Sequence, residues 1–266
     1  MKKAKNKKES QSDYLLHFTS IEAFLGMLSP WMNSDKKEDA PYLTLHATVF
    51  SKMNDAGENK IIYDNFFTES EWKSQIKTQY ENYLKTEKPY VISFVRGELK
   101  SKIDIPMWLN YGKGATGIYL RFDLKELNEY YKGKENYRFD KCQYVNSQDK
   151  KDKIADLNLY RRIGNCDSLF DEIKETSIFL KDKCWEYENE WRIVKFEKDE
   201  NAKQKITPRG VIEYTETTIP LNTLSKIHIG PKANKEWCEQ TLKVILAKIK
   251  DYNCSFNIEI SNLKIQ

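Results

Sequence analysis

Apolar side chains occupy alternate positions in several short segments, which is typical of strands with one buried face. The clearest case is Tyr42–Val49 (YLTLHATV), in which positions 43, 45, 47 and 49 are all apolar. Short apolar runs of similar length recur along the rest of the chain. The predicted strands are Tyr14–Phe18, Tyr42–Val49, Tyr90–Val95, Gly117–Phe122, Trp191–Phe196, Val211–Tyr214, Lys226–Ile229 and Phe256–Ile260.

Other segments place their apolar residues three or four positions apart, which predicts amphipathic helices over Glu69–Lys85 and Lys235–Lys250. A shorter helix is expected after Thr19, which has Glu22 three positions later in a capping-box pattern, and it should end near Pro30. Asp152–Asp182 is expected to be mostly helical. Strands and helices do not alternate regularly, so we expect an α+β fold and not a doubly wound parallel sheet.

The chain has 266 residues and a formal net charge of +4. Five of its lysines lie in Met1–Lys8, and without them the charge balance is −1. The basic field over a whole domain that would indicate a nucleic-acid-binding protein is therefore not supported. We expect residues 1–12 to be a disordered basic tail and residues 13–266 to form one domain.

Composition also indicates the cellular compartment of the protein and whether it has a metal site. No apolar stretch approaches the roughly 20 residues of a membrane span, and the first residues lack the apolar core of a signal peptide. Five scattered cysteines without a CxxC pair indicate a reducing cytoplasm and no disulfide framework. The three histidines show no close ligand spacing, so we expect no metal centre.

The segment Gly112–Gly117 (GKGATG) fits the GxGxxG pattern of dinucleotide-binding loops. Such a loop needs a strand before it and a helix after it, so that phosphates meet the helix N-terminus. Here a strand follows instead. The segment is therefore expected to be a turn leading into a strand, and not a cradle for pyrophosphate.

The segment Cys184–Val194 (CWEYENEWRIV) carries the most informative pattern of charged residues. In an extended conformation Glu188, Glu190 and Arg192 would share one face, about 6.5–7 Å apart. Two carboxylates so placed repel each other, which raises the pKa of one of them unless a cation such as Arg192 compensates. From this segment alone, a solvated and ion-paired strand face is the simpler interpretation, and a functional carboxylate pair is the alternative.

Other candidate residues also have a structural and a functional interpretation. His17 lies among apolar residues, where a hydrogen-bonded structural histidine is the commoner case. Trp108 and Tyr111, three positions apart, indicate core packing or the wall of a cleft for a flat ring. Ser51–Glu58 offers oxygen atoms to a cation but lacks the spacing of a calcium loop, which favours a structural loop.

These segments together resemble the bacterial domain-of-unknown-function family 2971, which is associated with the ADP-ribosyltransferase superfamily. The resemblance covers roughly residues 14–250 and rests on the order of the motifs, since none of them is specific alone. The motifs are His17-Phe18-Thr19-Ser20, Ser51-x-x-Asn54-Asp55-x-x-Glu58, Ser93-Phe94, Met107-Trp108-x-x-Tyr111, Gly117-Ile118-x-Leu120-x-Phe122, Trp185-x-x-Glu188-x-Glu190-Trp191-Arg192 and Ile219-Pro220-Leu221…Ile229-Gly230-Pro231.

The superfamily resemblance implies a split β-sandwich with flanking helices that holds NAD, as a substrate, in a central cleft. It implies that Glu190 is the catalytic acid, that Glu188 stands two residues before it as in the ExE pattern, and that His17 binds an NAD ribose hydroxyl. Tyr111 or Ser93 would take the middle position of the motif set. The candidate cofactor-binding residues are His17, Ser93, Trp108, Tyr111 and Arg192.

Cleavage of the bond between nicotinamide and ribose builds positive charge on the sugar, as in glycoside hydrolysis. A carboxylate stabilises that charge, and a second carboxylate can take the proton of the incoming nucleophile. NAD supplies the reactive bond, so no metal is expected.

The leading hypothesis is an ADP-ribosyltransferase-like enzyme that modifies an unidentified protein or nucleic acid. Its family association suggests a toxin or phage-defence system, with an antitoxin or defence partner. NAD hydrolysis and an inactive binding or regulatory module are the alternatives.

Overall fold

The computed structural model describes residues 13–34, 40–53, 71–97, 105–145, 174, 176–197, 201–207 and 210–265, and for residues 71–76 it describes the backbone only. The basic tail over residues 1–12, most of the helix expected over Asp152–Asp182, and residues 54–58 of the oxygen-rich loop lie outside these ranges.

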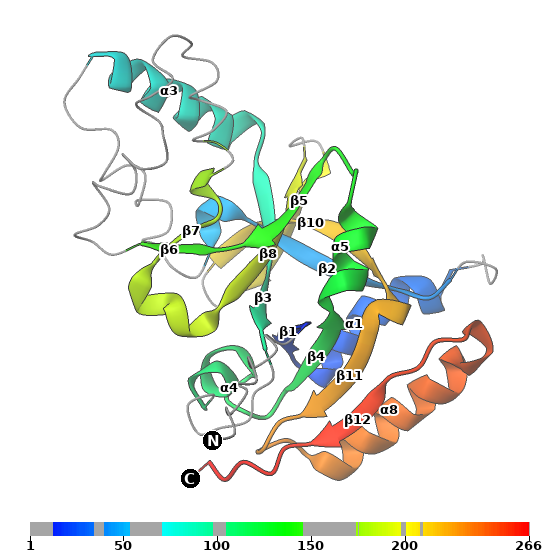
Figure 1. Cartoon of the computed structure of the whole chain (residues 1–266). Coiled ribbons are helices and arrows are strands. Elements are labelled where there is room, and N and C mark those ends of the chain that lie inside the picture. Colours follow the sequence, from blue (N-terminus) through cyan, green and yellow to red (C-terminus); the bar gives the residue numbers. More distant parts are fainter. Residues whose placement is uncertain are drawn as a thin grey trace, which may run out of the picture.

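Ten strands form one large, mixed sheet in the order β12-β11-β4-β1-β3-β2-β10-β9, with β8 attached to β3 and β5 attached to β8 (Figure 1). The pairs are antiparallel except β11–β12, and β6 and β7 form a separate parallel pair. The strands are β1 (Tyr14–Thr19), β2 (Tyr42–Val49), β3 (Pro89–Arg96), β4 (Ile118–Asp123), β5 (Tyr137–Lys141), β6 (Gln143–Val145), β7 (Leu180–Asp182), β8 (Glu190–Phe196), β9 (Lys203–Thr207), β10 (Gly210–Pro220), β11 (Leu224–Ile229) and β12 (Asn257–Ile260).

Strand β3 is the branch point of the sheet, because it pairs with three strands. One edge is paired with β8 along its length, from Pro89 to Val95. The other edge is shared: β2 pairs with β3 at Tyr90 and Val91, and β1 pairs with it at Val95 and Arg96. Between these two short pairings, at residues 92–94, β1 and β2 diverge from the same edge of β3. This divergence opens the middle of the sheet.

Helices cover parts of the sheet, and the predicted α+β class is confirmed (Figure 1). Helix α8 runs beside β11 and β12, while α5 lies beside β4 and β5. The α-helices are α1 (Ile21–Met32), α3 (Glu71–Thr86), α4 (Ile105–Tyr111), α5 (Leu124–Tyr131) and α8 (Lys235–Ile249). The 3-10 helices are η1 (Phe50–Lys52), η4 (Lys183–Glu188), η6 (Leu221–Thr223) and η7 (Lys250–Tyr252).

The main core lies between the sheet and the apolar faces of α1 and α8. Phe24 and Leu28 of α1 are fully buried there, as is Leu242 of α8. The ring of Phe24 meets Phe256 edge to face, with 6.3 Å between the ring centroids. Burying each such side chain stabilises the fold by about 1.5–3 kcal/mol, which explains why the apolar face of each helix is turned toward the sheet.

The start and end of α1 differ from the sequence prediction. Ser20, and not Thr19, is the N-cap, because its Oγ accepts a hydrogen bond from the amide of Ala23 at 3.1 Å. The helix also continues past Pro30 to Met32. Trp31 is buried on the core face and meets Tyr252 edge to face. The free energy gained by this packing offsets the helical hydrogen bond that is lost at Pro30, which has no backbone N–H.

The glycine-rich segment is a turn, as expected. Residues 112–116 form consecutive turns and β4 begins at Ile118, so the segment opens a strand and not a helix. A Cβ atom on Gly117 would lie 2.3 Å from the carbonyl oxygen of Thr19. The close approach of the turn to β1 therefore requires glycine at position 117.

Several elements were not predicted. Besides the 3-10 helices, they are helix α4, the strands β5, β6, β7 and β9, and helix α5. Asp123 is the N-cap of α5, and its side chain accepts hydrogen bonds from the amides of Lys125 and Glu126. Leu180–Asp182 was expected to be the end of a helix and is instead strand β7. Its parallel pairing with β6, a partner nearly 40 residues earlier in the chain, decides this conformation.

Candidate active site

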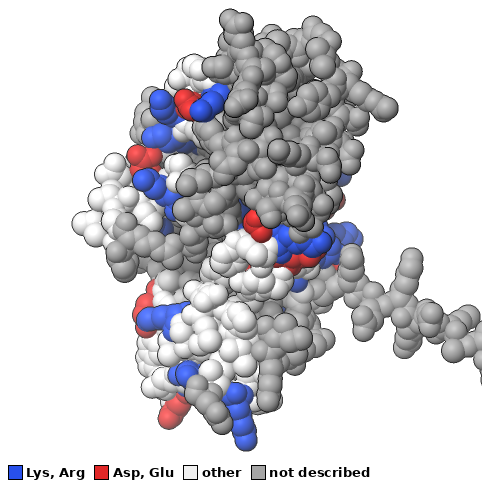
Figure 2. Space-filling model, turned by 90° about the vertical axis from the view of Figure 1, so that its left-hand side faces the viewer, with Lys and Arg blue, Asp and Glu red and all other residues white. Residues whose placement is uncertain are grey.

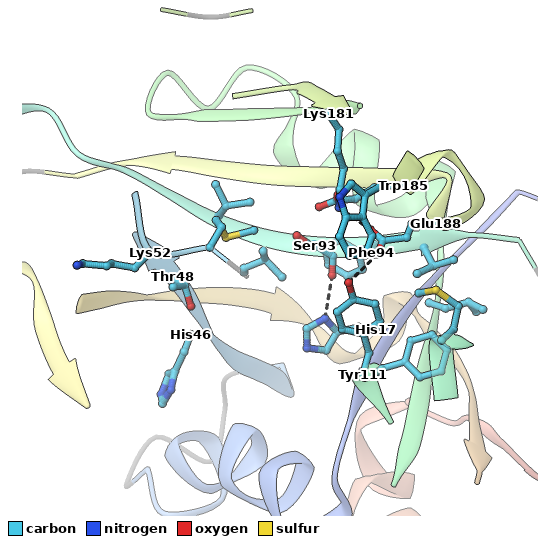
Figure 3. A pocket seen from close by; sticks show the side chains of 18 of the residues that line it. His17, His46, Thr48, Lys52, Ser93, Phe94, Tyr111, Lys181, Trp185 and Glu188 are labelled. Atoms are coloured by element: carbon cyan, nitrogen blue, oxygen red, sulfur yellow. Dashed lines mark hydrogen bonds and ion pairs between the residues drawn. The ribbon is translucent and has the colours of Figure 1, made fainter. Parts of the chain in front are cut away.

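A pocket with a volume of about 630 Å³ lies where β1 and β2 diverge from β3 (Figure 3). This volume lies within the range of about 300–1,000 Å³ that is usual for small-molecule sites. Side chains of β1, β2, η1, β3, α4, β7, η4, β8, β9 and β10 line it. Segments far apart in the sequence therefore meet at one cavity.

His17 lies on β1 and lines the pocket. Its Nδ1 is 3.1 Å from the carbonyl oxygen of Ser93, and its ring packs against Phe94 with 5.5 Å between the centroids. A carbonyl oxygen can only accept, so Nδ1 carries the proton and Nε2 keeps a lone pair. Burial lowers the pKa of His17, and the backbone hydrogen bond opposes this only in part. The ring is consequently neutral at pH 7 and presents one acceptor nitrogen.

Glu188 and Glu190 both line the pocket and are both buried. The sequence-based expectation that they share one strand face is wrong. Glu188 ends the 3-10 helix η4, Asn189 has a left-handed backbone (φ 42°), and β8 begins at Glu190. Nor are they solvated. Instead the ammonium group of Lys181 joins them, with Nζ 2.5 Å from Oε2 of Glu188 and 2.7 Å from Oε2 of Glu190.

Arg192 completes this buried ion cluster. Its Nε donates to Oε1 of Glu190 at 2.9 Å and its Nη2 to Oε2 at 3.1 Å, while Nη1 donates to the carbonyl of Ile178. Burial alone would raise the pKa of Glu190, but Arg192 and then Lys181 outweigh it and lower the pKa to about 2. The carboxylate is therefore ionised throughout the physiological range. The sequence-based expectation that Arg192 compensates the carboxylates is confirmed for Glu190.

Tyr111 projects from α4 into the pocket, and its hydroxyl donates to Oε1 of Glu188 at 2.6 Å (Figure 3). Burial, together with the hydrogen bond to the carboxylate, raises the pKa of Tyr111 well above its ordinary range. The phenol stays protonated and orients Glu188. A second phenol, that of Tyr144, accepts a hydrogen bond from the backbone amide of Glu190 at 2.6 Å.

The remaining candidates separate into pocket and core residues. Ser93 lines the pocket, and its buried Oγ has no hydrogen-bond partner among the described residues. Trp108 does not line the pocket: it is 1 % exposed and packs edge to face on Phe18, in a small cluster that also contains Tyr119. Arg192 is fully buried behind Glu190 and is not a lining residue either. The structure thus gives Trp108 the core-packing role, and Arg192 acts on the pocket through Glu190.

Sequence reasoning missed Lys181 and Trp185. Lys181 lies on a segment that was expected to be helical, seven residues before Glu188, and no motif singled it out. Trp185 belongs to the WEYENEWR motif, and its ring lies 5.4 Å from Nζ of Lys181 beside the pocket (Figure 3). The motif could have indicated Trp185, whereas only the tertiary structure could indicate Lys181.

No group of three or more His, Cys, Asp or Glu side chains among the described residues is arranged to hold a metal ion. On the face seen in Figure 2, basic and acidic side chains of described residues lie next to each other. No helix in the described part of the chain is long and apolar enough to cross a membrane.

Residues 107–193 match the model of a family described as "Protein of unknown function (DUF2971)". The match confirms the family resemblance expected from the motifs, over a range that includes Tyr111, Glu188 and Glu190. No curated protein and no solved structure matches the chain.

Proposed function

We propose that the protein binds NAD in the pocket at the branch of β3 and transfers its ADP-ribose group to an acceptor, releasing nicotinamide. The observation that carries this proposal is the convergence of His17, Tyr111, Glu188 and Glu190 on one cavity. His17 and Glu190 are 173 positions apart, and β3 lies between their strands. The divergence of β1 and β2 from one edge of β3 also agrees with the split sheet that the superfamily resemblance implies.

The charge state of Glu190 suits stabilisation of a cation. When the bond between nicotinamide and ribose breaks, positive charge develops on the sugar. A fixed carboxylate beside that charge lowers the barrier because its interaction grows as the charge develops. Since the pKa of Glu190 is about 2, this group serves as a permanent anion and not as a proton acceptor.

The neighbouring groups have complementary roles in the proposal. Nε2 of His17 accepts a hydrogen bond from a ribose hydroxyl, because the neutral ring has a lone pair on that atom. Glu188, held by Tyr111, takes the proton of the attacking nucleophile. Trp185 and Tyr111 provide aromatic walls against which the nicotinamide ring packs.

The test is release of nicotinamide from NAD by the wild-type protein and by its Glu190→Gln variant. We expect the variant to be slower by about 100-fold or more, because one oriented charge contact is lost. The matched control is Glu186→Gln, which changes an exposed glutamate of η4 that does not line the pocket. Wild-type turnover by a folded Glu190→Gln protein would refute the assignment.

One observation favours a second candidate function, an NAD-binding module that does not catalyse. Lys181 and Arg192 neutralise both carboxylates, so a ribosyl cation gains little there unless Lys181 moves away. In that case the wild-type protein would bind NAD and release no nicotinamide. The same assay, with the binding of NAD measured by calorimetry, separates the two functions.

A further inference from the structure

The two ends of the pocket differ in charge. At one end lie Glu188 and Glu190, whose charges are offset by Lys181 and Arg192. The opposite part, here called the outer end, is formed by His46 and Thr48 of β2, Lys52 of η1, and Lys205 and Thr207 of β9. Figure 3 shows His46, Thr48 and Lys52 on the side of the pocket away from Tyr111 and Glu188.

Lys205 is a half-buried cation without an acidic partner among the described residues. Its ammonium group lies 5.1 Å from the centre of the Tyr214 ring, and that ring also packs on His46 with 4.1 Å between the centroids. Burial lowers the pKa of Lys205 because the charged form loses solvation. An unpaired ammonium in such a place costs free energy that an anionic ligand would offset.

Two described acidic side chains near the outer end, Glu216 and Glu213, are already paired. Glu216 lies opposite His46 in the β2–β10 pairing, and Lys203 binds its carboxylate at 2.7 Å. Glu213 of β10 is bound by Lys88 at 2.9 Å. The lining of the outer end contains no acid in the described part of the chain. Among the described residues, no acidic side chain therefore compensates the positive charge of Lys52 and Lys205 at this end.

We propose that the outer end of the pocket binds a diphosphate group, with Lys205 as the principal cationic contact and Lys52 as a second one. A diphosphate carries several acceptor oxygens and at least two negative charges, which match two ammonium groups and the hydroxyl of Thr48. That the diphosphate belongs to NAD rests on the proposed function. The anion site itself stands on the charges and geometry of the outer end.

The test is calorimetric titration of the wild-type protein with ADP-ribose, which carries the diphosphate but no nicotinamide. We expect Lys205→Met to weaken binding at least about tenfold, because a charge-assisted contact is lost. Lys205→Arg should retain most of the affinity, and Lys52→Met should have a smaller effect because this ammonium is exposed. Inorganic pyrophosphate should displace ADP-ribose, and raised ionic strength should weaken binding.

The control is Lys248→Met, which removes the same charge from an exposed position on α8. Equal affinities of Lys205→Met and Lys248→Met for ADP-ribose, or no binding to the wild-type protein, would overturn the anion site. If ADP-ribose binds through Lys205 but NAD is not cleaved, the site stands and the catalytic proposal fails. If NAD is cleaved and Lys205→Met keeps the wild-type KM for NAD, the catalytic proposal stands and the anion site fails.

Discussion

Replacement of Lys181 by methionine tests whether the buried charges near the pocket compensate one another. Methionine keeps much of the volume of the side chain and removes its charge. Lys181 is 5 % exposed and lies between two buried carboxylates. Without it, the cluster of Glu188, Glu190 and Arg192 carries one uncompensated negative charge.

The structure sets the size of the expected effect. The pKa of Glu190 falls from 4.5 to about 2, and this difference corresponds to about 3 kcal/mol, at about 1.4 kcal/mol per pKa unit. Arg192 supplies the larger part of it. Glu188 loses its lysine partner as well and keeps Tyr111. Removing one member of a buried ion cluster typically costs about 3–5 kcal/mol, and we expect Lys181→Met to lower the free energy of unfolding by about 3 kcal/mol at pH 7.

The dependence on pH distinguishes charge from packing. In the wild-type protein the folded state holds Glu190 ionised, so its contribution is complete above pH 4.5 and is lost as the pH falls toward 2. In Lys181→Met the folded state should bind a proton on the glutamate pair more readily than the unfolded chain does. The variant should therefore recover part of its lost stability between pH 7 and pH 5, a range in which Glu190 does not change the stability of the wild-type protein.

Urea denaturation at pH 7 and pH 5 measures both quantities. The matched control is Lys183→Met, which removes an exposed lysine two residues away. A Glu188→Gln substitution added to Lys181→Met should recover part of the loss at pH 7, because the unpaired charge is gone. A loss of equal size at both pH values, unchanged by Glu188→Gln, would show that charge compensation is not the cause.

Three further predictions concern single positions. His17→Ala should weaken NAD binding and lower the free energy of unfolding by about 1 kcal/mol, the cost of the hydrogen bond to the Ser93 carbonyl. His228→Ala removes a ring that is stacked on the core residue Tyr119 and does not line the pocket, and it should leave NAD binding unchanged. Calorimetry and thermal melts check both variants, and normal NAD binding by His17→Ala would contradict the prediction. Gly117→Ala should lower the free energy of unfolding by more than about 2 kcal/mol, because its Cβ would meet the Thr19 carbonyl at 2.3 Å, and a urea midpoint like that of the wild type would contradict this. Ser20→Ala should cost about 1 kcal/mol through loss of the N-cap of α1, measured in the same way, whereas Ser20→Asp should retain the cap.

The sequence by itself determined the α+β class and most of the strands and helices that form the sheet and its core. Strand β2 has the predicted bounds, Tyr42–Val49, because alternation of apolar and polar side chains follows from a sheet with one buried face. The pattern also identified Gly112–Gly117 as a turn before a strand. Such features depend on neighbouring residues, and local sequence carries that information.

Local sequence also named several residues of the site without fixing their arrangement. His17, Tyr111, Glu188 and Glu190 all line one pocket, but the expected common strand face for the two glutamates was wrong. Asn189 adopts a left-handed backbone between them, which no alternation pattern indicates. Lys181 bridges the two carboxylates through ion pairs, and this lysine lies outside the motif.

Only the tertiary structure decided the features that depend on pairing between distant segments. The divergence of β1 and β2 on one edge of β3 creates the pocket, and it follows from strand pairings that span the chain. Lys181 becomes a buried partner of two glutamates because β7 pairs with β6 and brings it there. Lys205 reaches the outer end through the β9–β10 pairing. The physical reason is the same in each case: burial and charge compensation depend on which strands pair, and pairing joins residues that are far apart in sequence.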